Sequence, residues 1–293
     1  MSAASQATAG LTRSNKGLRR WLSARVPMTV SIVITLLVLA PLIWAISTAL
    51  KSEVEAVAYP PAFWPSQITF ENFARVLNGQ NFLTELWNSV CYSFGGVFLS
   101  ILVSAPAAYA AARFDIRGKT ALLLLILGSS MIPTVALLVP IFGILEKFGM
   151  VNSALAIIVI EAARTAPQNI WFIRSFIEAV PKEIEEAAFI DGATRRQTFF
   201  TVVLPLIKPG LAATSILSLI TVWNDYLTVA VFAPESSSRT LQVAIVNQVL
   251  DSNGISWSYM MAFVLVASAP VVTIFLASQR WFVSGLMAGG VKG

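Results

Sequence analysis

Four polar side chains within apolar stretches are the first candidates for chemistry. Glu161 and Arg164 lie three residues apart in one stretch, and Asn224 and Asp225 are adjacent in a later one. Charged side chains in an apolar stretch are costly and usually have a function or a partner. Two interpretations stay open for each pair. Glu161 and Arg164 either serve a pathway or form a neutralised pair facing a partner chain. Asn224 and Asp225 either line a pathway for a polyol or cap a broken helix.

The composition excludes most enzyme chemistry. The 293 residues include no histidine and one cysteine, so Ser-His-Asp and Cys-His arrangements are excluded. The usual zinc and haem ligand sets are missing as well. The segment Arg117–Thr120 ends like a phosphate-binding loop, but Arg113 stands where that motif requires glycine, and no strand precedes it. We therefore predict no catalytic residue, no metal site, no cofactor and no ATP site in this chain.

The apolar stretches themselves predict a membrane protein. Hydrophobic residues make up 56% of the chain and charged residues 12%, whereas about 25% is usual for a soluble domain. Runs of about 20 apolar residues are long enough to cross a bilayer as helices. The prediction is an all-α polytopic membrane protein with six transmembrane helices, at 28–50, 88–111, 120–145, 154–176, 210–233 and 258–280.

The basic residues orient these helices. With a cytoplasmic N-terminus, most of the 20 lysines and arginines fall on the cytoplasmic side, as the positive-inside rule requires. The net charge of +5 thus reflects membrane topology, and we expect no nucleic acid as a partner. Both termini are predicted to be cytoplasmic, with outer loops at about 51–87 and 234–257.

One cytoplasmic loop contains an elbow of two short helices. Pro181–Asp191 predicts the first helix, since proline suits a first turn and the acids there favour the positive end of the helix dipole. Gly192 would end this helix and Thr194 would cap the second. Pro205 and Pro209 then return the chain to the membrane. The elbow either lies on the lipid surface or docks to a protein, and its acidic start favours docking.

The elbow also carries a recognisable signature. Glu186-Ala187-Ala188, then Gly192 after three residues, then Val202-Val203-Leu204-Pro205 after nine resembles the EAA motif of ABC importer permeases, EAA-x3-G-x9-I-x-LP, with Val202 in place of isoleucine. Other segments resemble the G-type permease of the maltose importer and its relatives over nearly the whole chain: DGAT at 191–194, WNDYL at 223–227, RTLQVAI at 239–245, ITFENFARVL at 68–77 and QRWFVSGLMAGGVKG at 279–293.

The resemblance implies a type I ABC importer permease in the bacterial inner membrane, forming half of a pore for a carbohydrate or related glycoside. The elbow would be a coupling helix that transmits the motion of ATPase subunits. The implied coupling residues are Glu186, Ala187, Ala188, Asp191, Gly192, Leu204 and Pro205. The implied partners are a homologous permease, a dimer of ATPase subunits that bind ATP and Mg, an external solute-binding protein and membrane lipid.

On this interpretation the chain has four segments. These are a cytoplasmic basic tail at 1–27, the first span and an external segment at 28–87, a core of five spans at 88–280 that includes the coupling loop at 177–209, and a cytoplasmic tail at 281–293. Two other functions stay open. An ion-coupled secondary carrier would show an inverted repeat and uptake without ATP. A membrane-embedded transferase would need paired carboxylates or a metal cluster at the membrane surface.

Overall fold

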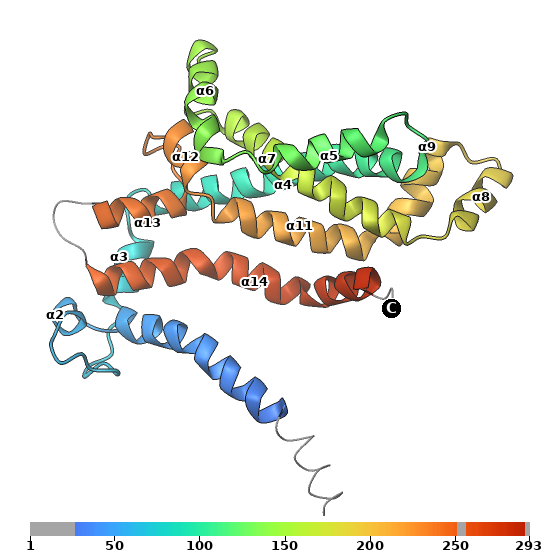
Figure 1. Cartoon of the computed structure of the whole chain (residues 1–293). Helices are drawn as coiled ribbons and strands as arrows, with labels where there is room; N and C mark the ends of the chain where they lie inside the picture. The colour runs from blue at the N-terminus through green and yellow to red at the C-terminus, as the bar shows by residue number, and fades with distance from the viewer. Residues whose placement is uncertain (1–26, 251–255, 291–293) are drawn as a thin grey trace, which may run out of the picture. The chain divides into compact units, whose positions relative to one another are not determined.

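The computed structural model describes the backbone of residues 27–250 and 256–290, and every regular element in these ranges is a helix (Figure 1). The predicted all-α class is confirmed. The basic tail at 1–27 lies almost wholly outside the described residues. The chain divides into two compact units: Met1–Asn72 with Ser256–Ala262, and Phe73–Ile255 with Phe263–Gly293.

The first unit holds the apolar helix Pro27–Ala49 and the short α2 (Glu53–Ala56). Asn72 fixes the chain after the apolar helix, because its Nδ2 donates to the carbonyls of Ala49 and Lys51, at 2.9 Å each. The carboxylate of Glu53 accepts hydrogen bonds from the hydroxyls of Ser256 and Ser258, and the latter bond is 3.1 Å long. α3 (Glu71–Leu77) begins where this unit ends.

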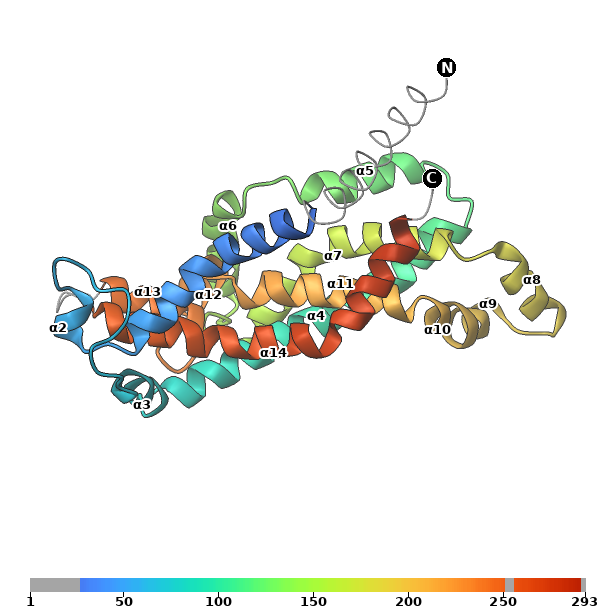
Figure 2. The ribbon, with the colours of Figure 1, turned by 90° about the horizontal axis from the view of Figure 1, so that it is seen from below.

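The second unit is built on three helices that lie side by side (Figures 1 and 2): α4 (Phe82–Arg113), α7 (Ala154–Glu178) and α11 (Lys208–Trp223). Small residues let α4 and α7 approach closely. A Cβ atom on Gly95 would lie 2.8 Å from Ile158 Cδ1, and one on Gly96 would lie 2.9 Å from Glu161 Cβ. Small residues at such crossings are typical of helices that pack within membranes.

A buried hydrogen-bond network joins the same three helices. The hydroxyl of Ser100 on α4 accepts from Thr165 Oγ1 at 2.9 Å and from Asn169 Nδ2 at 2.8 Å, both on α7. Asn169 Oδ1 in turn accepts from Ser218 Oγ of α11 at 2.7 Å. Each of these polar groups thus has a hydrogen-bond partner inside the helix bundle, which a polar group needs where lipid offers none.

Two of the predicted membrane helices are wrong as single helices. The predicted helix 120–145 is two helices, α5 (Lys119–Ser129) and α6 (Thr134–Lys147), which meet at 87°. Pro133 explains the break, because it lacks an N–H and disfavours helical geometry in the preceding residue. The predicted helix 210–233 is also interrupted, since three residues separate the end of α11 at Trp223 from the start of α12 (Leu227–Phe232).

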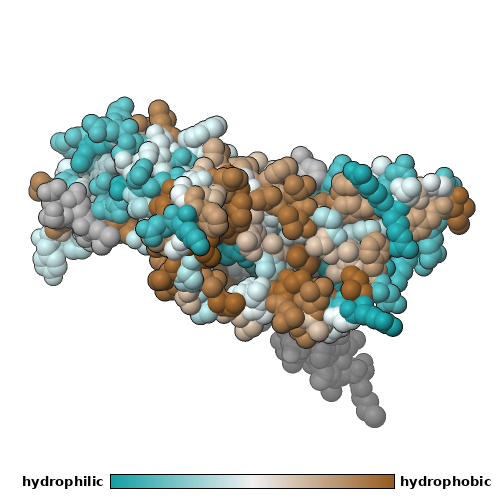
Figure 3. Space-filling model, turned by 90° about the horizontal axis from the view of Figure 1, so that it is seen from above, coloured by the Kyte–Doolittle hydropathy of each residue, from teal (hydrophilic) through white to brown (hydrophobic). Residues whose placement is uncertain are grey.

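The remaining helices are α13 (Leu241–Leu250), in the predicted outer loop, and α14 (Trp257–Gly290). Three described helices are long and apolar enough to cross a membrane. This number rises to five if each of two bent pairs is one span, namely Lys119–Ser129 with Thr134–Lys147 and Arg195–Leu206 with Lys208–Trp223. The three are Pro27–Ala49, Phe82–Arg113 and Trp257–Gln279. On the face in Figure 3, hydrophobic residues gather over the middle, and hydrophilic residues are more frequent toward both ends.

Candidate functional site

The elbow begins with α8 (Lys182–Ile190), which follows Pro181 as predicted. Gly192 ends it in the left-handed region, with φ of +87°. The N–H of Gly192 bonds to the carbonyl of Phe189 at 3.1 Å, and the N–H of Ala193 bonds to that of Ala188 at 2.9 Å. Glycine adopts this backbone conformation without the steric cost that a side chain would add. The predicted first helix and its stop signal are confirmed.

The second part of the elbow starts with a complete capping box. Thr194 Oγ1 accepts from the N–H of Gln197 at 3.3 Å, while Gln197 Oε1 accepts from the N–H of Thr194 at 2.8 Å. This fixes the first turn of α9 (Arg195–Thr198). The predicted cap at Thr194 is confirmed, and the reciprocal bond from Gln197 strengthens it.

Directly after α9, the helical turns become wider. Phe199–Val203 forms a π-helical turn, η1, in which the N–H of Leu204 reaches back to the carbonyl of Phe199. The second helical piece predicted from Thr194 is thus present, with a π-helical turn in its middle. Pro205 gives the physical reason, since it cannot donate to the carbonyl four residues before it and its ring would clash there. α10 (Leu204–Leu206) completes the elbow, and the segment Arg195–Leu206 meets α11 at 75°.

Most of the signature residues face outward. Glu186, Ala187, Asp191, Gly192 and Pro205 are exposed. Ala188 and Leu204 are half-buried and support the turn from within. Ile190, the last residue of α8, is 86% exposed. α8 therefore presents a small, mixed acidic and apolar surface at the end of the bundle.

Glu185 points the other way, and sequence reasoning missed it. Its Oε1 lies 2.6 Å from Arg113 Nε, and its Oε2 accepts from Tyr109 OH at 2.9 Å. Arg113 Nη2 also donates to the carbonyls of Ile177 and Val180, at 2.9 and 2.8 Å. In the sequence, Glu185 is marked only by its place directly before the EAA motif. Its pairing could not be predicted, because Arg113 is distant in sequence.

A second polar cluster lies deep in the same unit. Arg164 Nη2 lies 2.6 Å from Glu161 Oε2 and 3.0 Å from Asp225 Oδ2. The side chain of Glu161 is 1% exposed and that of Asp225 9%, compared with 27% for Arg164. The structure thus brings together three of the four residues predicted to serve a pathway. Glu161 and Arg164 do pair, and Asp225 joins them.

Asp225 has a second role at the helix break. Its Oδ1 accepts from the N–H of Thr228 at 3.1 Å, and its Oδ2 accepts from Thr228 Oγ1 at 2.7 Å. This caps the first turn of α12, so a capped, broken helix is confirmed for Asp225, while the pathway role of Asn224 and Asp225 stays a prediction. Asn224 is exposed and donates to the carbonyl of Ile220 at 2.8 Å. Trp223 is buried beside them, and its Nε1 donates to the carbonyl of Ala267 at 3.1 Å.

The cluster holds two carboxylates and one guanidinium. In the described part of the chain, Glu161 Oε1 is buried without a hydrogen-bond partner. An unsatisfied buried oxygen of this kind is costly. Two carboxylates thus share one guanidinium nitrogen, and an additional donor at Glu161 Oε1 would stabilise the arrangement.

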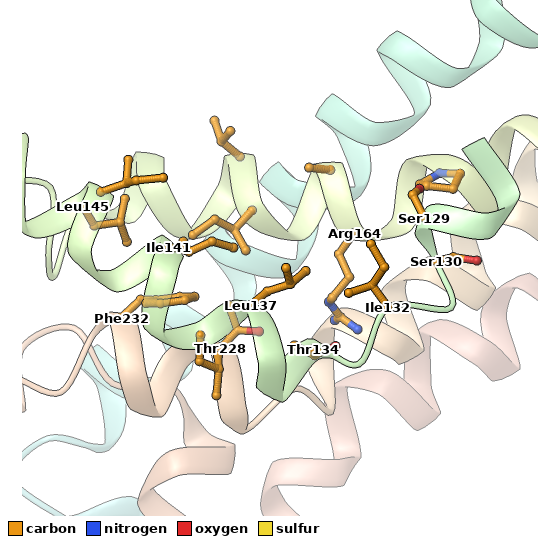
Figure 4. A pocket seen from close by; sticks show the side chains of 16 residues that line it. Ser129, Ser130, Ile132, Thr134, Leu137, Ile141, Leu145, Arg164, Thr228 and Phe232 are labelled. Carbon is orange, nitrogen blue, oxygen red and sulfur yellow. The ribbon is translucent and has the colours of Figure 1, made fainter. Parts of the chain in front are cut away.

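Arg164 also lies between two cavities. The larger, about 480 Å³, is lined mostly by apolar side chains of α6, α7 and α12 (Figure 4), among them Leu137, Ile141 and Phe232. The smaller, about 330 Å³, is lined by polar residues that include Asn224 and Asp225. Arg164 lines both, and Figure 4 shows it extending from α7 toward Thr134 at the start of α6. An apolar wall with a few converging polar groups is typical of a small-molecule site.

A helical membrane bundle with an exposed EAA elbow and a polar cluster between its helices defines a permease subunit of an ABC importer. The chain belongs to the family of binding-protein-dependent transport system inner membrane components, whose profile matches residues 96–287.

Full-length relatives agree with this assignment. The chain is 32% identical over 277 residues to the diacetylchitobiose uptake system permease protein DasC of Streptomyces coelicolor, covering 94% of this chain and 100% of that one. It is 32% identical over 265 residues to the trehalose/maltose transport system permease protein MalG of Thermococcus litoralis, covering 90% and 95%. A solved chain of a bacterial ABC transporter involved in import of the acidic polysaccharide alginate superposes with a TM-score of 0.77 at 25% identity, covering 89% and 96%.

Proposed function

We propose that this chain forms half of the translocation pore of a sugar importer, together with a homologous permease. The names of its relatives support a carbohydrate or glycoside substrate, since they include transporters of diacetylchitobiose and of trehalose and maltose. A solute-binding protein outside the membrane would deliver the sugar. ATP and Mg would bind to two partner ATPase subunits, whose hydrolysis would drive alternating access.

The observation that carries this proposal is the surface of α8. Glu186 and Ala187 are exposed on a helix that is fixed at both ends, by Pro181 and by the left-handed Gly192. Small alanines allow a protein surface to approach the backbone closely, and Glu186 offers a carboxylate for a basic partner residue. We infer that α8 is the coupling helix and docks to an ATPase subunit.

The same proposal assigns six spans and cytoplasmic termini. The spans are the apolar helix Pro27–Ala49, α4, the bent α5–α6 pair, α7, α11 with α12, and α14. α7 is shielded by α4 and α11, which is consistent with a span that carries charged residues. The Glu161–Arg164–Asp225 cluster would border the sugar pathway, with Asn224 beside it.

Charge reversal on α8 tests the coupling role. In the importer purified with its ATPase subunits, Glu186→Lys should reduce the amount of co-purifying ATPase by roughly tenfold or more, because an opposed charge at a docked site costs several kcal/mol. ATP-driven uptake into proteoliposomes of radiolabelled maltose, trehalose, melibiose and diacetylchitobiose gives a second measurement.

Glu183→Lys is the matched control, since Glu183 is exposed on the same helix but lies outside the signature. It should leave both the co-purification and the uptake close to wild type. Equal loss in the two variants would indicate a general charge effect. Normal assembly and uptake in Glu186→Lys would remove α8 as the coupling element. Uptake without ATP would instead support an ion-coupled carrier.

A further inference from the structure

The buried contacts of Glu185 suggest how α8 is connected to the bundle. Glu185 is 4% exposed, whereas the neighbouring Glu186 is exposed. The side chains of these two adjacent acids therefore point in different directions. One faces a prospective partner, and the other binds Arg113 and Tyr109 near the end of α4.

Arg113 joins three segments through separate nitrogen atoms. Its Nε binds Glu185 of α8, and its Nη2 donates to the carbonyls of Ile177 and Val180 at the end of α7. The Arg113 side chain is 8% exposed and that of Glu185 is 5% exposed. A charge pair this well buried, with Nη2 of the arginine bonded to two carbonyls, holds its members in one geometry far better than an exposed pair does.

The same end of α4 also contacts the second arm of the elbow. The ring of Tyr109 packs on Phe199 of η1 at 4.9 Å between centroids, and the guanidinium of Arg195 lies 5.0 Å from the ring of Phe114. Both arms of the elbow thus rest on one short segment of α4. The covalent route from the elbow into α11, by contrast, passes through the π-helical turn and a 75° bend.

We propose that Tyr109, Arg113 and Glu185 form a clamp that makes α8 move as one body with α4 and α7. Building on the proposed coupling role of α8, this assigns them as positioning residues that direct the motion of the ATPase into the α4–α7 pair first. α11 then follows through packing rather than by a direct pull along the chain.

A distance measurement within this chain tests the clamp. Spin labels are placed at position 183 on α8, which is exposed and lies outside the signature, and at position 103 on α4, where the native side chain is 55% exposed, in a Cys91→Ser background. The distance distribution is recorded in the assembled importer, without nucleotide and after trapping with ADP and vanadate. With the clamp intact, it should be narrow and the same in both states.

Glu185→Gln removes the charge pair and should replace the narrow peak by a broad distribution that differs between the two states. Arg113→Lys keeps the charge but loses the forked contacts, and should broaden the peak less. Tyr109→Phe removes one hydrogen bond and should have the smallest effect. If Glu185→Gln does not assemble, the other two variants decide the result.

Glu178→Gln is the matched control. It breaks the more exposed Arg174–Glu178 pair near the same end of α7, and should leave the distribution unchanged. Narrow, state-independent distributions in all clamp variants would overturn the proposal. So would a broad, state-dependent distribution in the unmutated chain. Failure of ATPase docking in Glu186→Lys concerns only the coupling role, because the clamp lies within this chain.

Discussion

At the scale of single residues, charge balance decides which substitution in the inner cluster does most harm. Removing Asp225 leaves Glu161 and Arg164 as a neutral pair, so the main cost is the lost cap of α12, typically about 1 kcal/mol. Removing Arg164 leaves two carboxylates that shared one nitrogen atom. We expect Arg164→Ala to cost about 3–5 kcal/mol, and Asp225→Ala much less.

Thermal unfolding of the purified permease in detergent, followed by size-exclusion chromatography, measures this difference. Asn224→Ala serves as the control, because Asn224 is exposed and its side chain donates to the carbonyl of Ile220 within its own turn. It should unfold close to the wild-type temperature. Equal destabilisation by Arg164→Ala and Asp225→Ala would show that excess negative charge is not what the cluster must balance.

At the scale of elements, Gly210 sets how closely the start of α11 packs on α7. A Cβ atom there would lie 2.4–2.7 Å from ring carbons of Phe176. Gly210→Ala should therefore destabilise the unit by about 1–3 kcal/mol, as overpacking does. Gly143→Ala is the control, since nothing lies within 4 Å of its Cβ position in α6, and it should be neutral or slightly stabilising. In thermal unfolding of the purified permease, adding Phe176→Ala should restore much of the stability that Gly210→Ala loses. If the double variant unfolds at a temperature no higher than Gly210→Ala alone, this packing is contradicted.

The local signals of the elbow were strong enough to predict it from sequence. Gly192 and Thr194 act on their immediate neighbours, so their effects follow from residue type and position. The direction of each acid on α8 could not be predicted in this way. Glu185 faces inward because Arg113 meets it there, and that contact depends on the fold of distant helices.

The helix breaks were only partly predictable, for a related reason. Hydropathy continues across Ser130–Pro133, whereas Asn224–Tyr226 is a short polar interruption of an apolar stretch that is long enough to be one span. Pro133 marks a break without giving its 87° angle. Asp225 could be predicted as either a pathway residue or a cap. Its simultaneous contacts with Thr228 and Arg164 required the tertiary structure.

At the scale of the whole molecule, the bent α5–α6 pair decides the topology. Its two helices meet at 87° and could form one span or a re-entrant loop. The two topologies differ in which side of the membrane position 190 shares with position 59. If the pair crosses, three spans separate position 59 from position 190, and one more separates 190 from 236. If it re-enters, only two spans separate 59 from 190.

Single cysteines at positions 59, 190 and 236 in a Cys91→Ser background distinguish these topologies. All three native side chains are exposed, with Tyr59 at 95% and Ile190 at 86%. Because the basic residues favour a cytoplasmic elbow, we expect a membrane-impermeant thiol reagent to label positions 59 and 236 in intact cells. Position 190 should react only after the membrane is opened, which serves as the control for its reactivity. Labelling of 59 and 190 from the same side, with 236 opposite, would mean that α5 and α6 re-enter and that the chain has five spans.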